Sequence, residues 1–388
     1  MISESITIKN FGPIKNIHIE EIKAFTVFIG ESASGKSTLL KVLALFRYLY
    51  KMQSIRSYLK HSNISKSPFR FTFDSYLKKS GLSEMVCANT IILYTVRNGD
   101  YAHSIIYQNG KLNGTSAVLD KSLLCYYKVS FVSEMRSVIS AWADRGARLA
   151  GGYLGYYFHE TYNDFEEAAD QLKQYDLDFL KLKFSLKKSG NQKEYIITPS
   201  DNSHNNIKLR DASSGIQTSL PVSIIIRYFA QNYKFAESLR NSLLKYLFTN
   251  DRIQDFTPSL KLERIPNYAF IHVEEPELSL FPDAQCDLIS NVVKSAFNEK
   301  NEDRNLGICI ATHSPFIINH LNVLLKAGFK NKLFDGASLQ EEQVAVYRLF
   351  DGELQDLRVQ DNSTGQILIN TLDLSETMHK IQQNFLSL

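Results

Sequence analysis

The stretch that decides the fold is AFTVFIGESASGKS, residues 24–37. Residues 24–29 are apolar except for Thr26, which predicts a strand buried on both faces. A loop with a glycine near each end follows: Gly30-Glu31-Ser32-Ala33-Ser34-Gly35-Lys36-Ser37, with Thr38 next. From Ser37 to Tyr50 the apolar positions keep the three-and-four spacing of a helix face. Strand, glycine loop and helix in this order are typical of a P-loop.

Each residue type in this loop suits phosphate chemistry. Gly30 and Gly35 leave room for backbone N–H groups to wrap the β- and γ-phosphates. Lys36 supplies a cation, Ser37 supplies a hydroxyl ligand for Mg²⁺, and the helix adds its positive end. The alternative is a glycine turn without a ligand. At average glycine content the pattern arises by chance in roughly one chain of this length in a hundred. We therefore expect residues 30–38 to bind ATP with Mg²⁺.

A second buried strand, predicted over residues 269–273, ends in the paired acids Glu274 and Glu275, followed by Pro276. Two acids after a strand usually form a solvated turn. Beside a P-loop, Glu274 is expected to hold the magnesium ion through water. Glu275 would position the attacking water and accept its proton.

Two further segments complete the predicted site. His313 follows an apolar strand predicted over residues 307–311, where its imidazole can donate to a γ-phosphate; a structural cap is the alternative. Ser213-Ser214-Gly215-Ile216-Gln217 precedes an apolar helix and offers a hydroxyl, N–H groups and a helix dipole to an anion. An ordinary N-cap explains that segment as well.

The segment at 213–217 resembles the signature motif of ABC ATPases. Ser214, Gly215 and Gln217 stand on matching positions, whereas Ser213 and Ile216 depart from the usual residues. The order of P-loop, signature, paired glutamates and His313 is also that family's order. Where the family carries its Q-loop, this chain has Ser133-Glu134-Met135-Arg136. The resemblance therefore implies Glu134 as a substitute metal contact.

Within that superfamily, residues 6–14 and the Glu-Glu-Pro-Glu form resemble the RecF, SMC and OLD-type branch rather than transporters. The resemblance implies an ATP-gated head-to-tail dimer, with Ser214 of one copy facing the γ-phosphate held by Lys36 of the other. No heptad run long enough for an SMC arm is present, and residues 314–388 are too few for the Toprim domain of OLD-type nucleases. In size and motif style the chain resembles stand-alone ATPases of anti-phage systems such as Septu, retron and PARIS.

Two functions stay open at this point. In the first, the ATPase is a sensor or scaffold that controls a separately encoded effector, a nuclease in many such systems. In the second, a RecF-like repair ATPase clamps DNA directly. The basic stretch from Arg47 to Lys79, with interleaved Tyr and Phe, would contact nucleic acid in the second function. A solvated helix face or a protein docking surface explains that stretch equally well.

The predicted fold is an α/β ABC-type P-loop fold with a mixed central sheet, an antiparallel β subdomain and an inserted helical lobe. We expect an N-terminal ATPase lobe at 1–135, a helical lobe and β hairpin at 136–235, a less patterned insertion at 236–266 and a C-terminal ATPase lobe at 267–388.

Composition agrees with a globular chain and excludes several classes. Of 388 residues, 44% are hydrophobic, and the 44 basic and 41 acidic residues nearly balance, so the net charge says little about partners. The four cysteines form no CxxC pair, which argues against a zinc ribbon or disulfide framework and favours a reducing cytosol. The start lacks the pattern of a signal peptide, and apolar runs are too short to span a bilayer.

Overall fold

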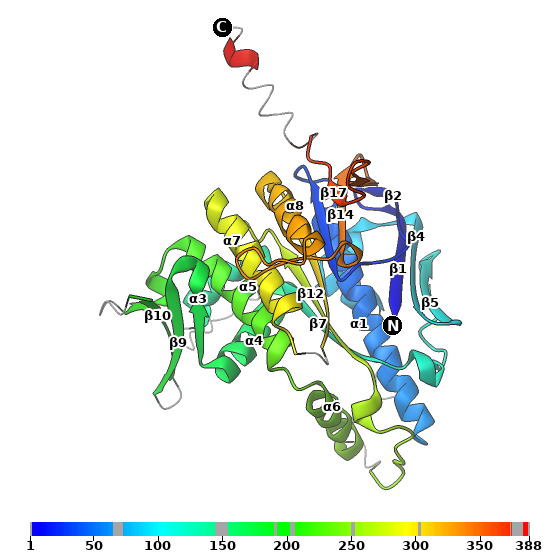
Figure 1. The fold of residues 1–388 in the computed structure, drawn as a ribbon. Helices are drawn as coiled ribbons and strands as arrows, with labels where there is room; N and C mark the ends of the chain where they lie inside the picture. Colours follow the sequence, from blue (N-terminus) through cyan, green and yellow to red (C-terminus); the bar gives the residue numbers. More distant parts are fainter. Residues whose placement is uncertain are drawn as a thin grey trace.

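A computed structural model describes most of the chain (Figure 1). The described residues are 2–64, 73–143, 154–189, 192–201, 206–249, 253–301, 304–372, 374 and 383–386.

The centre of the described structure is an eleven-stranded mixed sheet, in the order β6-β5-β4-β1-β2-β15-β14-β3-β13-β12-β7. Strands β14, β3, β13, β12 and β7 are parallel neighbours, whereas β6, β5, β4, β1 and β2 are antiparallel. The strands are β1 Ser3–Phe11, β2 Ile14–Ile19, β3 Phe25–Gly30, β4 Val86–Asn98, β5 Tyr101–Gln108, β6 Lys111–Asn113, β7 Tyr126–Val132, β12 Asn267–Glu274, β13 Asn305–Thr312, β14 Val344–Phe350 and β15 Glu353–Asp356. This architecture confirms the predicted mixed sheet and antiparallel subdomain.

The strand order determines where in the fold the predicted site lies. Strand β3 pairs with β13, and β13 pairs with β12, all in parallel. The carboxyl ends of parallel strands meet at one edge of a sheet, where ligands of open α/β folds bind. The P-loop lies at the end of β3, Glu274 is the last residue of β12, and His313 follows β13. Segments far apart in sequence are thus brought to the same edge.

Helices cover both faces of the parallel part of the sheet (Figure 1). Helix α1, Lys36–His61, packs on β7, β12 and β13. On the other face α5, Ser214–Gln231, packs on β12 and on α7, Pro282–Val293, which in turn contacts α8, Pro315–Phe329. The parallel strands are almost wholly buried, which explains their continuous apolar sequence.

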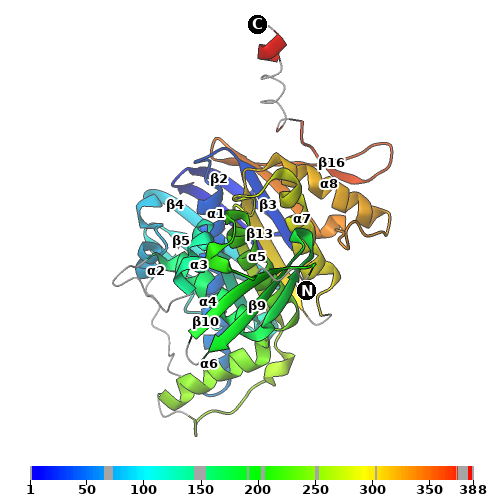
Figure 2. The same ribbon diagram turned by 90° about the vertical axis from the view of Figure 1, so that its left-hand side faces the viewer.

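The inserted lobe contains helices, as predicted, and a small sheet that has more strands than the expected β hairpin. Helices α3, Ile139–Ala143, and α4, Tyr156–Leu172, precede a four-stranded antiparallel sheet that faces the viewer in Figure 2. Its strands are β8 Gln174–Leu177, β9 Leu182–Ser189, β10 Gln192–Pro199 and β11 Ile207–Lys208. The sequence Gly151-Gly152 predicts a break in this helical region, and it lies outside the described residues.

The remaining described elements are α2, Phe73–Lys79; α6, Phe235–Thr249; and a small pair of strands, β16 Arg358–Gln360 and β17 Ile367–Ile369. Helix α6 corrects one expectation, because nearly half of the insertion placed at 236–266 is regular helix. Its buried residues Leu239, Leu243 and Leu247 recur every four positions on one face. The four cysteines are all free. No helix in the described ranges is both long and apolar enough to cross a membrane.

The basic stretch at 47–79 has a buried end and exposed positions. Arg47 is a core residue, which removes it from the possible nucleic-acid contact, whereas Lys60, Lys78 and Lys79 are exposed. Arg47 is 1% exposed, and its guanidinium forms an ion pair with Glu4 at 2.6 Å. It also contacts His272 Nε2 at 3.0 Å and lies 3.8 Å from the Phe270 ring centroid. Tyr50 is buried as well. Lys66, Phe69, Arg70 and Phe71 lie outside the described residues.

Candidate nucleotide-binding site

The loop from Gly30 to Ser37 joins β3 to α1, as predicted. A Cβ atom on Gly30 would lie 2.5 Å from the carbonyl oxygen of Leu349, so only glycine fits the close approach of β14. Gly35 has a φ of 104° and precedes the first residue of α1. Of the four residues between them, Glu31, Ser32 and Ala33 are exposed, and Ser34 is partly buried. The loop thus presents its backbone to solvent at the start of a long helix, where N–H groups attract anions.

The Lys36 side chain lies on the inner side of this loop. Its Nζ donates to the carbonyl oxygens of Gly30 at 2.9 Å and Glu31 at 2.7 Å, and lies 3.5 Å from His313 Nδ1. Burial lowers the pKa of Lys36, while Glu275 and Glu277 oppose that change. The neighbouring Thr38 is buried, with its hydroxyl 3.8 Å from Met85 Sδ, so its side chain serves packing.

The residues expected to hold magnesium are brought together. Glu274, 2% exposed, is in hydrogen-bonding contact with Glu134 and with the Ser37 side chain. Burial, and then the Glu134 carboxyl, raise the pKa of Glu274 to about 8, whereas the hydrogen bond to Glu274 lowers the pKa of Glu134 to about 2. The opposite pKa shifts have the same physical cause as a metal site: negative oxygens crowded in a buried place.

This donor set fits Mg²⁺. The Oε2 atom of Glu274 is buried without a hydrogen-bond partner among the described residues. Those residues hold no cluster of three or more His, Cys, Asp and Glu side chains suited to a metal. Mg²⁺ binds through one or two carboxylates together with substrate phosphates, so a site completed by a nucleotide is the arrangement expected. Lys41, which sequence reasoning missed, lies 3.4 Å from Glu274 Oε1 and partly balances its charge.

Glu275 and His313 also lie together. His313 Nε2 is 3.6 Å from Glu275 Oε1, and both side chains are about one third exposed, at 35% and 34%. The backbone N–H of His313 donates to Glu277 Oε1 at 2.6 Å. Glu275 has a φ of 44°, a left-handed conformation that costs free energy outside glycine and is common at functional sites. A carboxylate and an imidazole therefore border the space beside Lys36.

Arg136 is a second residue of this site to which sequence reasoning gave no role. It is fully buried, and its guanidinium donates to four backbone carbonyl oxygens, those of Ser133, Thr218, Glu274 and Glu275. These belong to the Glu134 segment, to α5 and to the turn after β12. Burial lowers the pKa of Arg136 to about 10, so the group stays charged at neutral pH. One guanidinium thus joins three parts of the site.

The start of α5 contacts the turn after the paired glutamates. The Thr218 hydroxyl donates to the Leu278 carbonyl at 2.8 Å, and a Cβ on Gly215 would lie 3.0 Å from the Ser279 carbonyl. Ser214 is exposed, as a nucleotide contact would require. Gln217 differs from the expectation, because its amide donates inward to the carbonyls of Arg210 and Ala212 and so supports the preceding loop.

Comparison with known families agrees with this geometry. The family model of the AAA ATPase domain matches residues 1–81 and 157–318, which is more than half of the chain. The chain belongs to the AAA ATPase domain family. It is therefore an ATPase, as predicted, and the matched ranges contain the P-loop, Ser214, both glutamates and His313. No curated protein matches its sequence.

Solved structures similar to this ATPase are distant. The SMC head domain from Thermotoga maritima is 12% identical, with a TM-score of 0.39, and covers 93% of this chain and 100% of its own. The recombination mediator RecF with ATP is 12% identical, with a TM-score of 0.38, and the match covers 92% of this chain and 100% of the RecF chain. A dimeric ATP-binding cassette, MJ0796 with ADP and phosphate, is 13% identical, with a TM-score of 0.31. The match covers 90% of this chain and 96% of the MJ0796 chain.

Proposed function

We propose that this ATPase works as an ATP-gated head-to-tail dimer in which the start of α5 in one copy closes over the nucleotide held by the P-loop of the other. The observation that carries the proposal is the exposure of Ser213 and Ser214 at the N-terminus of an 18-residue helix. Ser213 forms no side-chain cap bond there. Hydroxyls and N–H groups at such a helix start suit an anion supplied from outside.

The residues around the P-loop have complementary roles in hydrolysis. Mg²⁺ held by Ser37, Glu274 and Glu134 would neutralise charge on the phosphates. The residues of this chain supply the rest: Lys36 offsets phosphate charge, and Glu275 orients water and accepts its proton. His313, next to Glu275, donates to the γ-phosphate.

Dimerisation can be measured directly. Glu275→Gln protein, which should retain ATP, is expected to sediment as a dimer with ATP and as a monomer without it. Ser214→Arg placed in the same background is the matched control, because a large cation at the start of α5 would obstruct the partner's P-loop. A monomer with saturating ATP, or an unaffected dimer in the double variant, would contradict the proposal.

The proposed biological role is a sensor or scaffold that controls a separately encoded effector, a nuclease, in anti-phage defence in the cytoplasm. The support is the resemblance in motif style and size, together with exposed apolar side chains at and after the end of α8: Phe329, Leu333 and Phe334 are 53%, 62% and 43% exposed. Such side chains are suited to a protein partner. The rival role, direct clamping of DNA, loses Arg47 as a contact because that residue is buried, but keeps the exposed Lys60, Lys78 and Lys79.

Duplex DNA separates the two roles. A DNA clamp should bind duplex in an ATP-dependent way, with an affinity that falls steeply as salt is raised. An effector-controlling ATPase should instead bind the product of a neighbouring nuclease gene, and replacing Leu333 by Asp should weaken that complex. Tight ATP-dependent DNA binding without any such protein complex would favour the rival.

A further inference from the structure

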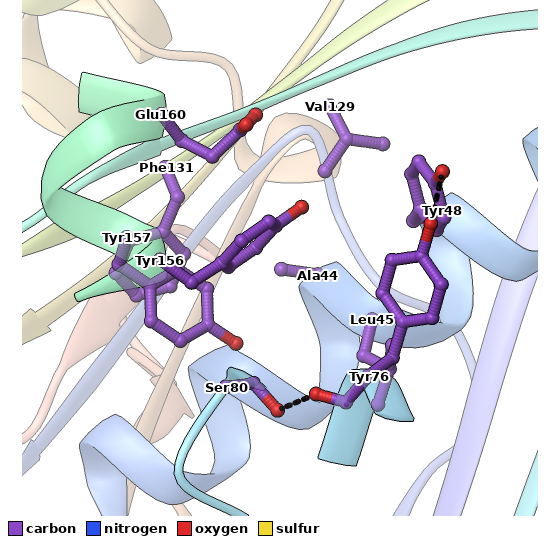
Figure 3. Close-up of a pocket in the computed structure, with 10 residues that line it drawn as sticks. All are labelled: Ala44, Leu45, Tyr48, Tyr76, Ser80, Val129, Phe131, Tyr156, Tyr157 and Glu160. Carbon is purple, nitrogen blue, oxygen red and sulfur yellow. Dashed lines mark hydrogen bonds between the residues drawn. The ribbon is translucent and has the colours of Figure 1, made fainter. Parts of the chain in front are cut away.

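A cavity outside the nucleotide site lies between α1, α2, β7 and α4 (Figure 3). Its empty volume, including the mouth, is about 430 Å³. Five aromatic rings form most of its wall: Tyr48, Tyr76, Phe131, Tyr156 and Tyr157. These come from four elements of the ATPase core and the inserted lobe, so the cavity is built by the tertiary fold rather than by one helix.

The rings form two clusters. Phe131 and Tyr157 have centroids 4.1 Å apart, and Tyr48 and Tyr76 have centroids 5.1 Å apart. The hydroxyls of Tyr48 and Tyr76 lie 2.8 Å from each other and form a hydrogen bond. Aromatic faces carry negative electrostatic potential and attract cations within about 6 Å. Tyr157 already shows this behaviour, because Lys41 Nζ lies 5.3 Å from its ring centroid.

Two polar groups of the wall have no hydrogen bond to any described residue: the Glu160 carboxylate and the Tyr156 hydroxyl. Figure 3 shows both directed toward the middle of the cavity. Burial, and then the neighbouring Asp164, raise the pKa of Glu160. Two lysines act on Glu160, but neither forms an ion pair with it: Lys128 is paired with Asp164 at 2.6 Å, and the Lys51 ammonium lies 5.4 Å from the Tyr126 ring centroid. A single carboxylate thus faces a mainly aromatic cavity without forming an ion pair in the described part of the chain.

We propose that this cavity is a binding site for an organic cation with N–H donors, that is, an ammonium or guanidinium group. The carboxylate of Glu160 would accept a charge-assisted hydrogen bond, the Tyr156 hydroxyl a second bond, and the rings would surround the cation. The same chemistry is offered by a free amine and by a lysine or arginine side chain of another protein.

The cavity is adjacent to the catalytic apparatus. Tyr157 lines the cavity, Lys41 lies over the Tyr157 ring, and the Lys41 ammonium lies 3.4 Å from Glu274. A ligand that fixes the Tyr157 ring therefore contacts a side chain that is linked, through Lys41, to the carboxylate expected to hold Mg²⁺. This position suits a regulatory ligand.

Binding can be tested on the full chain with two probes of matched shape, n-butylamine and 1-butanol. The only tryptophan, Trp142, packs against Phe158 of α4 at 5.7 Å, so its fluorescence reports on this helix, and calorimetry gives a second readout. The amine is expected to bind and the alcohol to bind at least tenfold more weakly. Equal binding of both probes, or binding of neither, would overturn the proposal.

Variants assign the binding to this cavity. Glu160→Gln keeps the shape but removes the charge and should weaken butylamine binding about tenfold or more, because charged hydrogen bonds are the stronger ones. Tyr156→Phe should weaken it less. Glu166→Gln, on the same helix but outside the cavity, is the matched control and should bind as the natural protein does. Unchanged affinity in folded Glu160→Gln protein would contradict the assignment.

Two further probes identify the source of the cation. Tighter binding of putrescine than of a capped lysine amide indicates a free amine as the ligand. The reverse order indicates a side chain of a partner protein. Either order supports the site, provided that Glu160→Gln weakens the tighter probe.

Discussion

Replacing Arg136 by lysine should remove hydrolysis while leaving nucleotide binding nearly intact. The guanidinium donates to the carbonyl oxygens of Glu274 at 2.7 Å and Glu275 at 2.5 Å, and to that of Thr218 at 2.9 Å. Lysine keeps the charge but has one nitrogen, so it cannot reach all four acceptors of the buried fork. The Glu275 backbone, held at a φ of 44°, then loses a fixed partner.

The magnitude follows from the lost bonds. Leaving about two buried carbonyls without a donor costs roughly 1–3 kcal/mol each, a large part of the roughly 5–15 kcal/mol that stabilises a domain. A displacement of the catalytic carboxylate by about 1 Å can lower the rate about a hundredfold. We therefore expect a lower melting temperature, a kcat reduced about a hundredfold and an ATP affinity changed less than about threefold, because the P-loop does not contact Arg136.

The assay is single-turnover hydrolysis well below the melting temperature, with ATP affinity measured on the same folded protein. Arg227→Lys is the matched control: it lies on α5 and pairs with Glu299 at 2.6 Å on a partly exposed surface. A kcat within about twofold of the natural protein in Arg136→Lys would refute the positioning role. A parallel loss of affinity and rate would point to general unfolding instead.

Three further outcomes follow from the site. Lys36→Ala should abolish tight ATP binding, because the phosphates lose their buried cation; unchanged affinity by calorimetry would remove the basis of the site assignment. Glu275→Gln should bind ATP but turn over at least about a hundredfold more slowly, and full turnover would move the general base elsewhere, with Glu274 next in line. The pKa of Glu274 is raised from 4.5 to about 8 in the folded protein. Protonation of Glu274 therefore favours the folded over the unfolded state. This contribution is fully present below about pH 4.5 and is lost as the pH rises toward 8. Magnesium-free protein should therefore lose up to about 1.4 kcal/mol per pH unit over that window, and Glu274→Gln should show a flatter melting profile; identical profiles would contradict the raised pKa of Glu274.

Local sequence signals were sufficient where the chemistry depends on neighbours in the chain. The glycine loop, the paired acids and the position of His313 after a buried strand each carry their own pattern, and the parallel sheet brings them together. The helix in the insertion was missed although Leu239, Leu243 and Leu247 showed its spacing.

Residues whose role depends on distant partners were not predictable. Arg47 belongs to a basic stretch in sequence, but its counter-ion Glu4 lies on β1, 43 residues earlier. Arg136 bonds only to backbone carbonyls, and those acceptors have no side-chain signature. Gln217 matches a motif position, yet its side-chain amide donates hydrogen bonds to backbone carbonyls of the loop at 210–212. Only the tertiary structure shows which partner each of these side chains meets.

The composite site, in which two copies complete each other, is tested most directly by mixing two inactive variants. Lys36→Ala disables the P-loop of one copy, and Ser214→Arg disables the start of α5 of the other. A mixed dimer has one site with both defects and one with neither, so partial ATPase activity should return on mixing although each variant alone is inactive. A mixture that stays inactive while mixed dimers demonstrably form, or full activity of Ser214→Arg alone, would contradict the account.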